Sequence, residues 1–423
     1  MRSTRQQSNK TQVLEYLNKT AEECRQLTKL NLSFRSKNIS DDSLNKICQE
    51  LKQCKNLEYL KLDLLQNKIT SKGILYFDSL WKALPNLKIL NFNIQNNNIK
   101  DAGLAALMKG LEQIKKLEDL TIELTNTNIS KSGNEQLFKH LGNLQNMIKL
   151  NLHCGYNVQC GLSQSIQKSL SKLTKLKEVY FDIYESCLEN QDIKYLSEAF
   201  ANCTSLLVLS LNLQGNFISK IGAEQFSEVL KKFKNLQKLV LYLDGNMFED
   251  SGLSSLGNSL AQLQSLSVIK FDLYNNKITD EGLIDFTSSL TMCKQLKGID
   301  IFMVRNDLTS KGMQILFEKL HQIPKLLSLS LGFSSKSIDE HTIKPLVSFI
   351  KDNKNLIELK LTLREENIKQ DMAQLLQQVI TQNKQLIKID FDSIQYFYNS
   401  KYIQNFKRKM TNLVVFGQYY DGY

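Results

Sequence analysis

The sequence is poor in the residues that separate domains and in those that build catalytic centres. Only three prolines occur in 423 residues, and no Gly/Ser-rich, proline-rich or low-complexity tract interrupts the chain, so the composition offers no linker between domains. Four histidines leave few candidates for acid-base chemistry. No apolar run could cross a bilayer, and the polar start MRSTRQQSNKTQ lacks the apolar segment of a signal peptide. We therefore expect a soluble cytoplasmic protein without membrane insertion.

What the sequence does contain is a repeat. Counted from Leu87 as position zero, the text reads L-x-x-L-x-L-x-L-x-x-N-x-I-x-x-x-G, with further apolar residues at positions 17, 20, 24 and 27. Eleven of the twelve steps between repeats span 30 residues, and one spans 29. The first positions are Leu27, Leu57, Leu87, Leu117, Met147, Leu176, Leu206, Leu236, Leu266, Leu296, Leu326, Leu356 and Leu386. This register indicates one repeat architecture along the chain.

The two halves of each repeat have different periods. LKILNFNI, residues 87–94, alternates apolar and polar residues, which is typical of a strand with one buried face. DAGLAALMKGLEQI, residues 101–114, places Leu104, Leu107 and Leu111 at helical spacing. One such unit cannot bury its own apolar face, whereas stacked units share a continuous core. The sequence therefore predicts an α/β solenoid with thirteen parallel strands.

The repeat resembles the leucine-rich repeat of the ribonuclease-inhibitor type, with a strand segment two residues longer than usual. Text such as LNLQGNFISKIGAEQFSEVL is also similar to the long-repeat proteins of ciliates. The resemblance covers about residues 13–416 and implies a curved parallel sheet on the concave side, helices on the convex side, and a role in binding partners. We expect an N-terminal tail and capping helix over residues 1–26, twelve repeats over 27–385, and a C-terminal capping repeat with an aromatic tail over 386–423.

The resemblance also assigns a role to the asparagine at position ten. In this family its side-chain amide satisfies backbone groups inside the turn. The matching residues are Asn67, Asn97, Asn216, Asn246, Asn276 and Asn306. Ser186, Lys336 and Glu366 replace Asn there, so we expect an irregular ladder in those repeats.

The cysteines follow the same register. Cys24, Cys54, Cys203 and Cys293 all occupy position 27, where other repeats have Leu or Ile, so we expect buried core residues. Cys154 and Cys160, with His153, form the one cluster that suggests a metal or redox pair, but their spacing matches no zinc motif. We assign no metal, cofactor or catalytic residue. Carboxylate pairs on neighbouring strands stay an open alternative for glycosidase chemistry.

The charge is unevenly placed. The chain carries a formal net charge of +11, which suggests an acidic partner. Positions four, six and eight, expected on the concave face, hold five basic and eight acidic residues. The basic ones are Arg35, Lys61, Lys270, Lys360 and Arg364; the acidic ones are Asp63, Glu123, Asp182, Asp244, Asp272, Asp300, Asp390 and Asp392. The positive excess follows the helices, in LKKFKNL and QIKKLE, where lysine either stabilises the helix end or forms a basic edge.

The middle of the predicted concave face is rich in aromatic and acidic residues. They are Tyr180, Asp182, Tyr184, Tyr242, Asp244, Asp272, Tyr274, Asp300 and Phe302. Tyrosine offers a large contact area, and the carboxylates favour a cationic partner. The competing interpretation is a chance mixture of ordinary strand-forming residues.

The sequence therefore favours a non-catalytic scaffold that binds a protein with a basic surface on its concave face, within a larger assembly. The ciliate resemblance adds a ciliary or cytoskeletal location as an expectation. One alternative is a binder of acidic polymers, nucleic acid or acidic tubulin tails, through the basic edge. Another is a GTPase-activating protein, because one leucine-rich-repeat family of this type acts on a small GTPase.

Overall fold

The computed structural model describes residues 26–157, 162, 164–334 and 340–364, followed by 375, 378–380, 382–383, 385–386, 388–392 and 414–415. The predicted capping helix before residue 26 and most of the predicted C-terminal cap lie outside these residues. The chain forms two compact units. Unit 1 comprises residues 1–188 and 195–206, and unit 2 comprises 189–194 and 207–423. Among the described helices, none is both long and apolar enough to span a membrane.

Unit 1 is a stack of strand and helix pairs in which neighbouring strands are parallel. Its strands are β1 (Lys29–Ser33), β2 (Tyr59–Asp63), β3 (Ile89–Asn93), β4 (Asp119–Glu123), β5 (Lys149–His153) and β6 (Glu178–Asp182). The helices between them are α2 (Asp41–Leu51), α3 (Ser71–Ile74), α4 (Tyr76–Ala83), α5 (Lys100–Leu111), α6 (Lys131–Leu141) and α7 (Gln164–Leu170). The division between the units passes through α8 (Asn190–Phe200).

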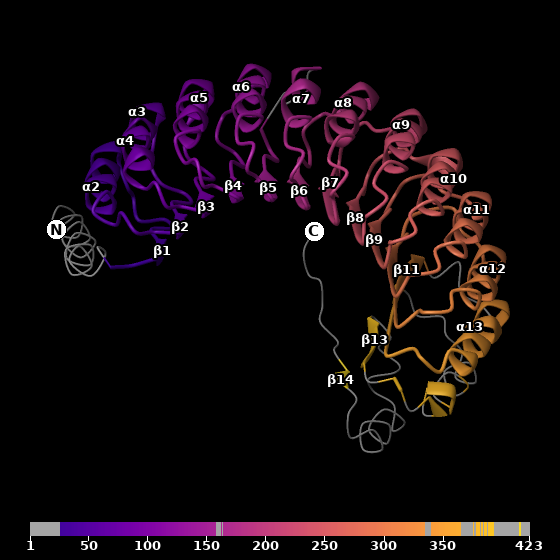
Figure 1. Ribbon diagram of the computed structural model, residues 1–423. Helices are drawn as coiled ribbons and strands as arrows, with labels where there is room; N and C mark the ends of the chain where they lie inside the picture. Colours follow the sequence, from indigo (N-terminus) through magenta and orange to yellow (C-terminus); the bar gives the residue numbers. More distant parts are fainter. Residues whose placement is uncertain are drawn as a thin grey trace, which may run out of the picture. The chain divides into compact units, whose positions relative to one another are not determined.

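Unit 2 repeats the same pairing. Its strands are β7 (Val208–Asn212), β8 (Lys238–Tyr242), β9 (Val268–Asp272), β10 (Gly298–Phe302), β11 (Ser328–Ser334), β12 (Glu358–Arg364), β13 (Lys388–Asp392) and β14 (Val414–Val415). Its helices are α9 (Lys220–Leu230), α10 (Glu249–Leu260), α11 (Asp280–Leu290), α12 (Ser310–Leu320) and α13 (Glu340–Asp352). In each unit the helices cover one side of the sheet and leave the strands exposed on the other (Figure 1).

The predicted strand register is confirmed. Each of the thirteen expected strands is present, β1 to β13, and each begins two residues after the first leucine of its repeat. Equivalent residues pair across neighbouring strands, as Leu90 does with Leu120. The one short step is absorbed outside the ladder, because β5 and β6 still pair in register, Lys149 with Glu178. Each unit is therefore a leucine-rich-repeat-like solenoid, and β14 is an addition that the repeat did not predict.

The core lies between the sheet and the helices of each unit. In β3 the inward residues Leu90 and Phe92 are fully covered while Asn91 and Asn93 between them are partly exposed. The single tryptophan, Trp81, stacks on Phe77 with ring centroids 5.1 Å apart, and Phe92 meets Phe77 edge-on at 4.9 Å. Covering a leucine or phenylalanine side chain stabilises the fold by about 1.5–3 kcal/mol. One inward face per strand and one stripe per helix therefore supply the driving force for stacking.

The asparagines at position ten form the expected ladder. Asn97 donates through its Nδ2 atom to the carbonyls of Ile94 in its own turn and Leu64 in the preceding repeat, at 3.0 and 2.9 Å. Its Oδ1 atom accepts from the backbone N–H of Ile69 at 3.1 Å. Asn246 makes the equivalent three bonds in unit 2. Ser186 donates to the carbonyl of Tyr184 in its own turn at 3.1 Å, while Lys336 and Glu366 lie outside the described residues.

A second ladder joins the starts of successive helices. The carboxylate of Asp41, the first residue of α2, accepts from the backbone N–H and the hydroxyl of Thr70 at 2.8 and 2.6 Å. A Cβ atom on Gly73 would lie 2.3 Å from that carboxylate, so the glycine leaves the space that the acid occupies. Asp101, Asn190, Asp250 and Asp280 bind Ser130, Ser219, Thr279 and Thr309 in the same way. We call this arrangement the carboxylate clamp, although Asn190 contributes an amide.

Candidate interaction surface

The open face is the side of each sheet that the helices leave uncovered. All nine aromatic and acidic residues predicted to contact a partner lie on it and are partly exposed. Tyr180, Asp182 and Tyr184 belong to unit 1, whereas Tyr242, Asp244, Asp272, Tyr274, Asp300 and Phe302 belong to unit 2. The sequence predicts one patch, whereas the structure divides these residues between the two units.

In unit 2 a lysine lies between an aromatic ring and a carboxylate. The Nζ atom of Lys270 on β9 is 5.5 Å from the ring centroid of Tyr242 on β8. The same atom is 3.5 Å from Oδ2 of Asp300 on β10. A cation held over an aromatic face is stabilised by the negative face of the ring. The open face of unit 2 thus binds one of its own cations.

Tyr274 and Phe302 form the second aromatic group of unit 2. Their rings are nearly parallel, 11° apart, with centroids separated by 6.4 Å. The guanidinium carbon of Arg305 is 5.3 Å from the centroid of Tyr274. Phe302 lies over Gly332 of β11, where a Cβ atom would stand 2.2 Å from a ring carbon. The glycine therefore leaves the space in which the ring lies.

Two carboxylates beside these rings are electrostatically strained. Burial and the neighbouring charge of Asp272 raise the pKa of Asp244 to about 6, against the opposing effects of Arg305 and a hydrogen bond from Gln214. The pKa of Asp272 is also raised, chiefly by burial and despite the backbone N–H of Tyr274, which donates to Oδ1 at 3.1 Å. A raised carboxyl pKa means that the charged form is disfavoured. A cation brought by a partner would relieve this strain.

In unit 1 the predicted contact residues are already engaged with one another. The hydroxyl of Tyr180 donates to Glu178 at 3.1 Å, and Lys149 lies 5.4 Å from its ring centroid. Asp182 is paired with His153 at 3.2 Å. Asp119, Asn151 and Asp182 each keep one covered side-chain oxygen without a hydrogen-bond partner in the described structure. Tyr180 and Asp182 are therefore bound within unit 1.

The ring of Tyr184, like that of Phe302, lies against a glycine. A Cβ atom on Gly155 of the preceding repeat would stand 2.2 Å from a ring carbon of Tyr184. Tyr156 meets the same ring edge-on, with centroids 4.9 Å apart. One tyrosine thus packs against the other, so less of the Tyr184 ring is presented to a partner.

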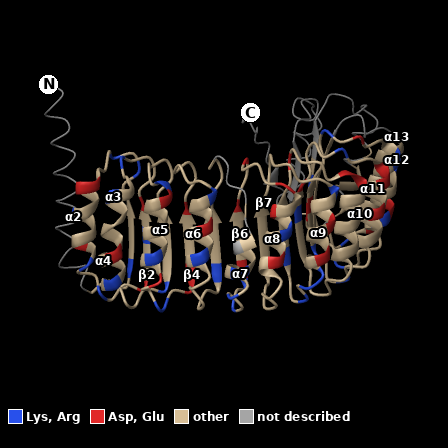
Figure 2. Cartoon of the chain, turned by 90° about the horizontal axis from the view of Figure 1, so that it is seen from above, with Lys and Arg blue, Asp and Glu red and all other residues tan. Residues whose placement is uncertain are grey.

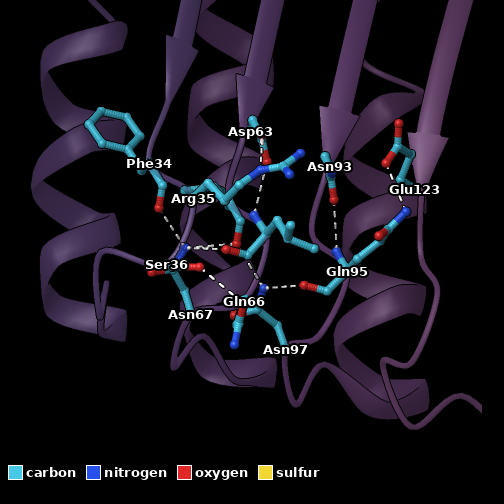
Figure 3. Close-up of polar contacts among 12 residues, drawn as sticks. Phe34, Arg35, Ser36, Asp63, Gln66, Asn67, Asn93, Gln95, Asn97 and Glu123 are labelled. Atoms are coloured by element: carbon cyan, nitrogen blue, oxygen red, sulfur yellow. Dashed lines mark hydrogen bonds and ion pairs between the residues drawn. The ribbon is translucent and has the colours of Figure 1, made fainter. Parts of the chain in front are cut away.

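Polar residues at the strand ends of unit 1 also pair across neighbouring repeats. Figure 3 shows Arg35 beside Asp63, with its Nε atom 3.3 Å from the carboxylate, and Gln95 donating to Glu123 at 2.8 Å. Asp63 was expected to be exposed on the open face, and this is wrong: it is only 8% exposed. Arg35 pairs with it from the turn after β1, and Leu65 donates its backbone N–H to it. Its charge is therefore largely withdrawn from any partner.

No protein-family model matches the chain, and no curated protein matches it. The functional inference therefore depends on the surfaces themselves.

A hollow of about 620 Å³ lies on the turns of unit 1. It is lined by Gln66, Asn67, Lys68, Thr70, Asn96, Asn97, Asn98, Asn126 and Asn128. Asn126 donates to Asn96 at 2.8 Å, and Asn128 donates to Asn98 at 3.2 Å. These amides largely satisfy one another, and the lining has no aromatic ring, so the hollow is a weaker candidate than the open face of unit 2.

Several lysines that follow the helices form hydrogen bonds within the stack of repeats. Lys115 and Lys294 donate to the carbonyls of Glu112 and Thr291 at the ends of their helices, both at 2.8 Å. Lys116 donates to the side chain of Asn86 in the preceding repeat at 2.8 Å. Acidic and basic residues are interspersed over the helices (Figure 2). These contacts favour helix capping over a dedicated basic edge, although the lysine charges remain at the surface.

The cysteines follow the prediction where the structure describes them. Cys54, Cys203 and Cys293 are buried, as is Cys154, while Cys24 and Cys160 lie outside the described residues. Burial raises the pKa of Cys203 to about 12 and that of Cys293 to about 11. Within the described residues no group of three or more His, Cys, Asp or Glu could hold a metal ion.

Three features escaped the sequence reasoning. Position two of each repeat, the first residue of its strand, holds Lys29, Lys149, Lys238 and Lys388 against Asp119, Glu178 and Glu358, so it adds a net charge of only +1. Asn157 belongs to the asparagine ladder, with bonds to Leu124 and Cys154. Of the two glycines that lie under aromatic rings, Gly332 could have been found from the sequence, because a glycine inside a strand often marks the close approach of another group.

Proposed function

We propose that this protein is a non-catalytic interaction scaffold and that the open face of unit 2 binds a protein partner through a basic surface. One observation carries the proposal: unit 2 presents the nearly parallel rings of Tyr274 and Phe302 beside the carboxylates of Asp272 and Asp300, and a guanidinium of the chain itself, Arg305, already lies 5.3 Å from the Tyr274 ring centroid. The same chemistry suits a lysine or arginine from another protein.

Charge supports this assignment. Asp272 and Asp300 stand at outward positions of β9 and β10, and Asp244 lies in the turn after β8. The pKa of Asp244 is raised to about 6 by burial and by the charge of Asp272. Complementary charge mainly sets the association rate and the choice of partner, while aromatic anchors supply most of the binding energy. The surface combines both contributions.

The repeat text supports a finer proposal. We infer that the units are leucine-rich repeats of the ribonuclease-inhibitor type, similar to the long repeats of ciliate proteins. Such repeats present a long strand face to other proteins, which suits a cytoplasmic protein of a cytoskeletal or ciliary assembly.

A direct binding experiment tests the interaction surface. A fluorescent nona-lysine peptide, titrated into the full chain at 150 mM salt and followed by fluorescence anisotropy, serves as the cationic probe. The double variant Tyr242→Ala/Tyr274→Ala should weaken binding more than tenfold, which corresponds to about 1.4 kcal/mol or more. The matched control in unit 1, Tyr180→Ala/Tyr184→Ala, should change it less than threefold. Equal losses in the two double variants would contradict the assignment to unit 2.

The acidic-polymer alternative is tested in the same assay. Lys231, Lys232 and Lys234 form one run after α9, and Lys231 is already paired with Glu228. If the basic edge is the true site, the chain binds polyglutamate with a steep salt dependence. Changing these three lysines to glutamine would then abolish that binding. Our proposal instead predicts that this triple variant binds the nona-lysine peptide as well as the wild-type chain does.

A further inference from the structure

The geometry around Phe302 points to an arginine-binding position on the open face of unit 2. We propose that the exposed ring of Phe302 stacks on the guanidinium group of an arginine from the partner, with Asp272 and Asp300 as its carboxylates. The inference rests on the proposed function, since it names the side chain that the basic partner would present.

The first support is the placement of the Phe302 ring. In register Phe302 stands opposite Asp272 on β9 and opposite Gly332 on β11. The ring lies over Gly332, because a Cβ atom there would be 2.2 and 2.6 Å from two ring carbons. A side chain at that position would push the ring away. The glycine thus lets an aromatic ring that is partly open to solvent rest against the sheet.

The second support is a guanidinium that the chain already places on the neighbouring ring. Arg305 lies 5.3 Å from the centroid of Tyr274, and the Tyr274 ring is within 11° of parallel to Phe302. Arg305 also lowers the pKa of Asp244 by its charge. This internal contact shows the chemistry that the ring pair accepts: a planar cation near an aromatic face, with a carboxylate close by.

The third support is the pair of carboxylates beside Phe302. The side chain of Asp300 is 42% exposed, and its ion pair with Lys270 is 3.5 Å long, which is a loose contact. Asp300 and Phe302 stand two residues apart on the same face of β10, and Asp272 stands about 5 Å away on β9 by strand spacing. An arginine stacked on Phe302 therefore lies within reach of both acids.

These features favour arginine over lysine. A guanidinium is planar, stacks on aromatic faces and binds a carboxylate through two parallel hydrogen bonds, whereas an ammonium acts as a compact and strongly hydrated point charge. A surface that offered charge alone would distinguish the two only weakly. A flat ring between two acids adds the stacking that lysine cannot match.

The test compares nona-arginine with nona-lysine on the full chain at 150 mM salt, by anisotropy. The expected result is that the wild-type chain binds nona-arginine at least fivefold more tightly. Gly332→Ala, which places a methyl group where the ring lies, should reduce this ratio to below twofold and leave the nona-lysine affinity within twofold. If Gly332→Ala fails to fold, Phe302→Leu, which removes the ring, should likewise reduce the affinity ratio to below twofold. Gly298→Ala on β10 is the matched control, because its added Cβ would make ordinary contacts of 3.6 Å.

The outcomes separate this inference from the proposed function. If both peptides bind equally, or if the arginine preference persists in both Gly332→Ala and Phe302→Leu, the arginine position is refuted while a basic partner still stands. Failure of the wild-type chain to bind either peptide would overturn both proposals. An arginine preference lost in Gly332→Ala and in Phe302→Leu, but kept in Gly298→Ala, supports the assignment.

Discussion

Unit 1 and unit 2 each place an aromatic ring over a glycine of a neighbouring repeat, and the two rings meet different surroundings. Tyr184 over Gly155 is packed edge-on by Tyr156. Phe302 over Gly332 runs parallel to Tyr274 and has Asp272 opposite in the sheet. A glycine beneath an aromatic ring thus allows internal packing in unit 1, whereas in unit 2 it holds a ring that a partner can contact.

The electrostatics follow the same division. In unit 1 the outward acids face donors on adjacent strands, Arg35 for Asp63 and His153 for Asp182. In unit 2 burial, together with the neighbouring charge of Asp272, raises the pKa of Asp244 to about 6. The lesson is that composition along the strand face does not identify a binding surface. The pairing across strands decides which charges remain for a partner.

The largest expected effect is a difference in alkylation rate between exposed and buried cysteines. Cys187 is exposed, whereas Cys203 in unit 1 and Cys293 in unit 2 are buried with strongly raised thiol pKa values. Because only an accessible thiolate reacts, Cys187 should be alkylated at least about a thousandfold faster than the other two. Timed alkylation followed by peptide mass mapping measures this. Cys187→Ser is the control for the fast phase, and alkylation of Cys203 at the rate of Cys187 would refute its place in the core.

The next effect concerns the asparagine ladder. Asn97→Ala in unit 1 and Asn276→Ala in unit 2 would each leave buried backbone carbonyls and an N–H without their partners, at a cost of about 2–4 kcal/mol in unfolding free energy. Chemical denaturation measures the loss, and hydrogen exchange shows which unit loses protection. Asn86→Ala, which removes only exposed contacts, a long bond to the carbonyl of Lys55 and a bond from Lys116, should cost less than about 1 kcal/mol. If each variant weakens both units equally, the units unfold as one.

The smallest expected effect is a gain in the free energy of unfolding. The pKa of Asp244 is about 6 in the folded chain against an ordinary value of 3.8, so folding favours the protonated form. The associated stability is present below about pH 4 and is lost as the pH rises through 6. Asp244→Asn should therefore be more stable than the wild-type chain at pH 7.5, by about 1 kcal/mol after allowance for solvent screening.

Urea unfolding between pH 4 and pH 7.5 measures the effect of Asp244→Asn, and the advantage should shrink as the pH falls. The comparison in unit 1 is Asp182→Asn, which removes an ion pair with His153 and should give no such gain. A pH-independent difference for Asp244→Asn would show that the ionisation of Asp244 is not its cause.

The sequence predicted the features that recur at a fixed position of each repeat. It missed the features that depend on which two side chains meet. The strands, the asparagine ladder and the buried cysteines at position 27 all follow from one register, because each repeat supplies the same residue to the same environment. Asp63 was expected to be exposed because its position faces outward, and only its pairing with Arg35, 28 residues earlier, explains its burial. The engagement of Tyr180 with Glu178 and Lys149 was missed for the same reason.

The carboxylate clamp has a consequence for how such a chain can be rearranged. Asp101 requires both the hydroxyl of Ser130 and the space above Gly133 in the repeat that follows. Lys220, at the position equivalent to Asp101, is instead followed by Glu249, with which it pairs at 3.0 Å. Each repeat therefore specifies its successor by chemistry and not only by length. Recombination that shuffles, duplicates or deletes single 30-residue segments would join mismatched neighbours, so repeats of this protein would be exchanged intact only together with the start of the next one.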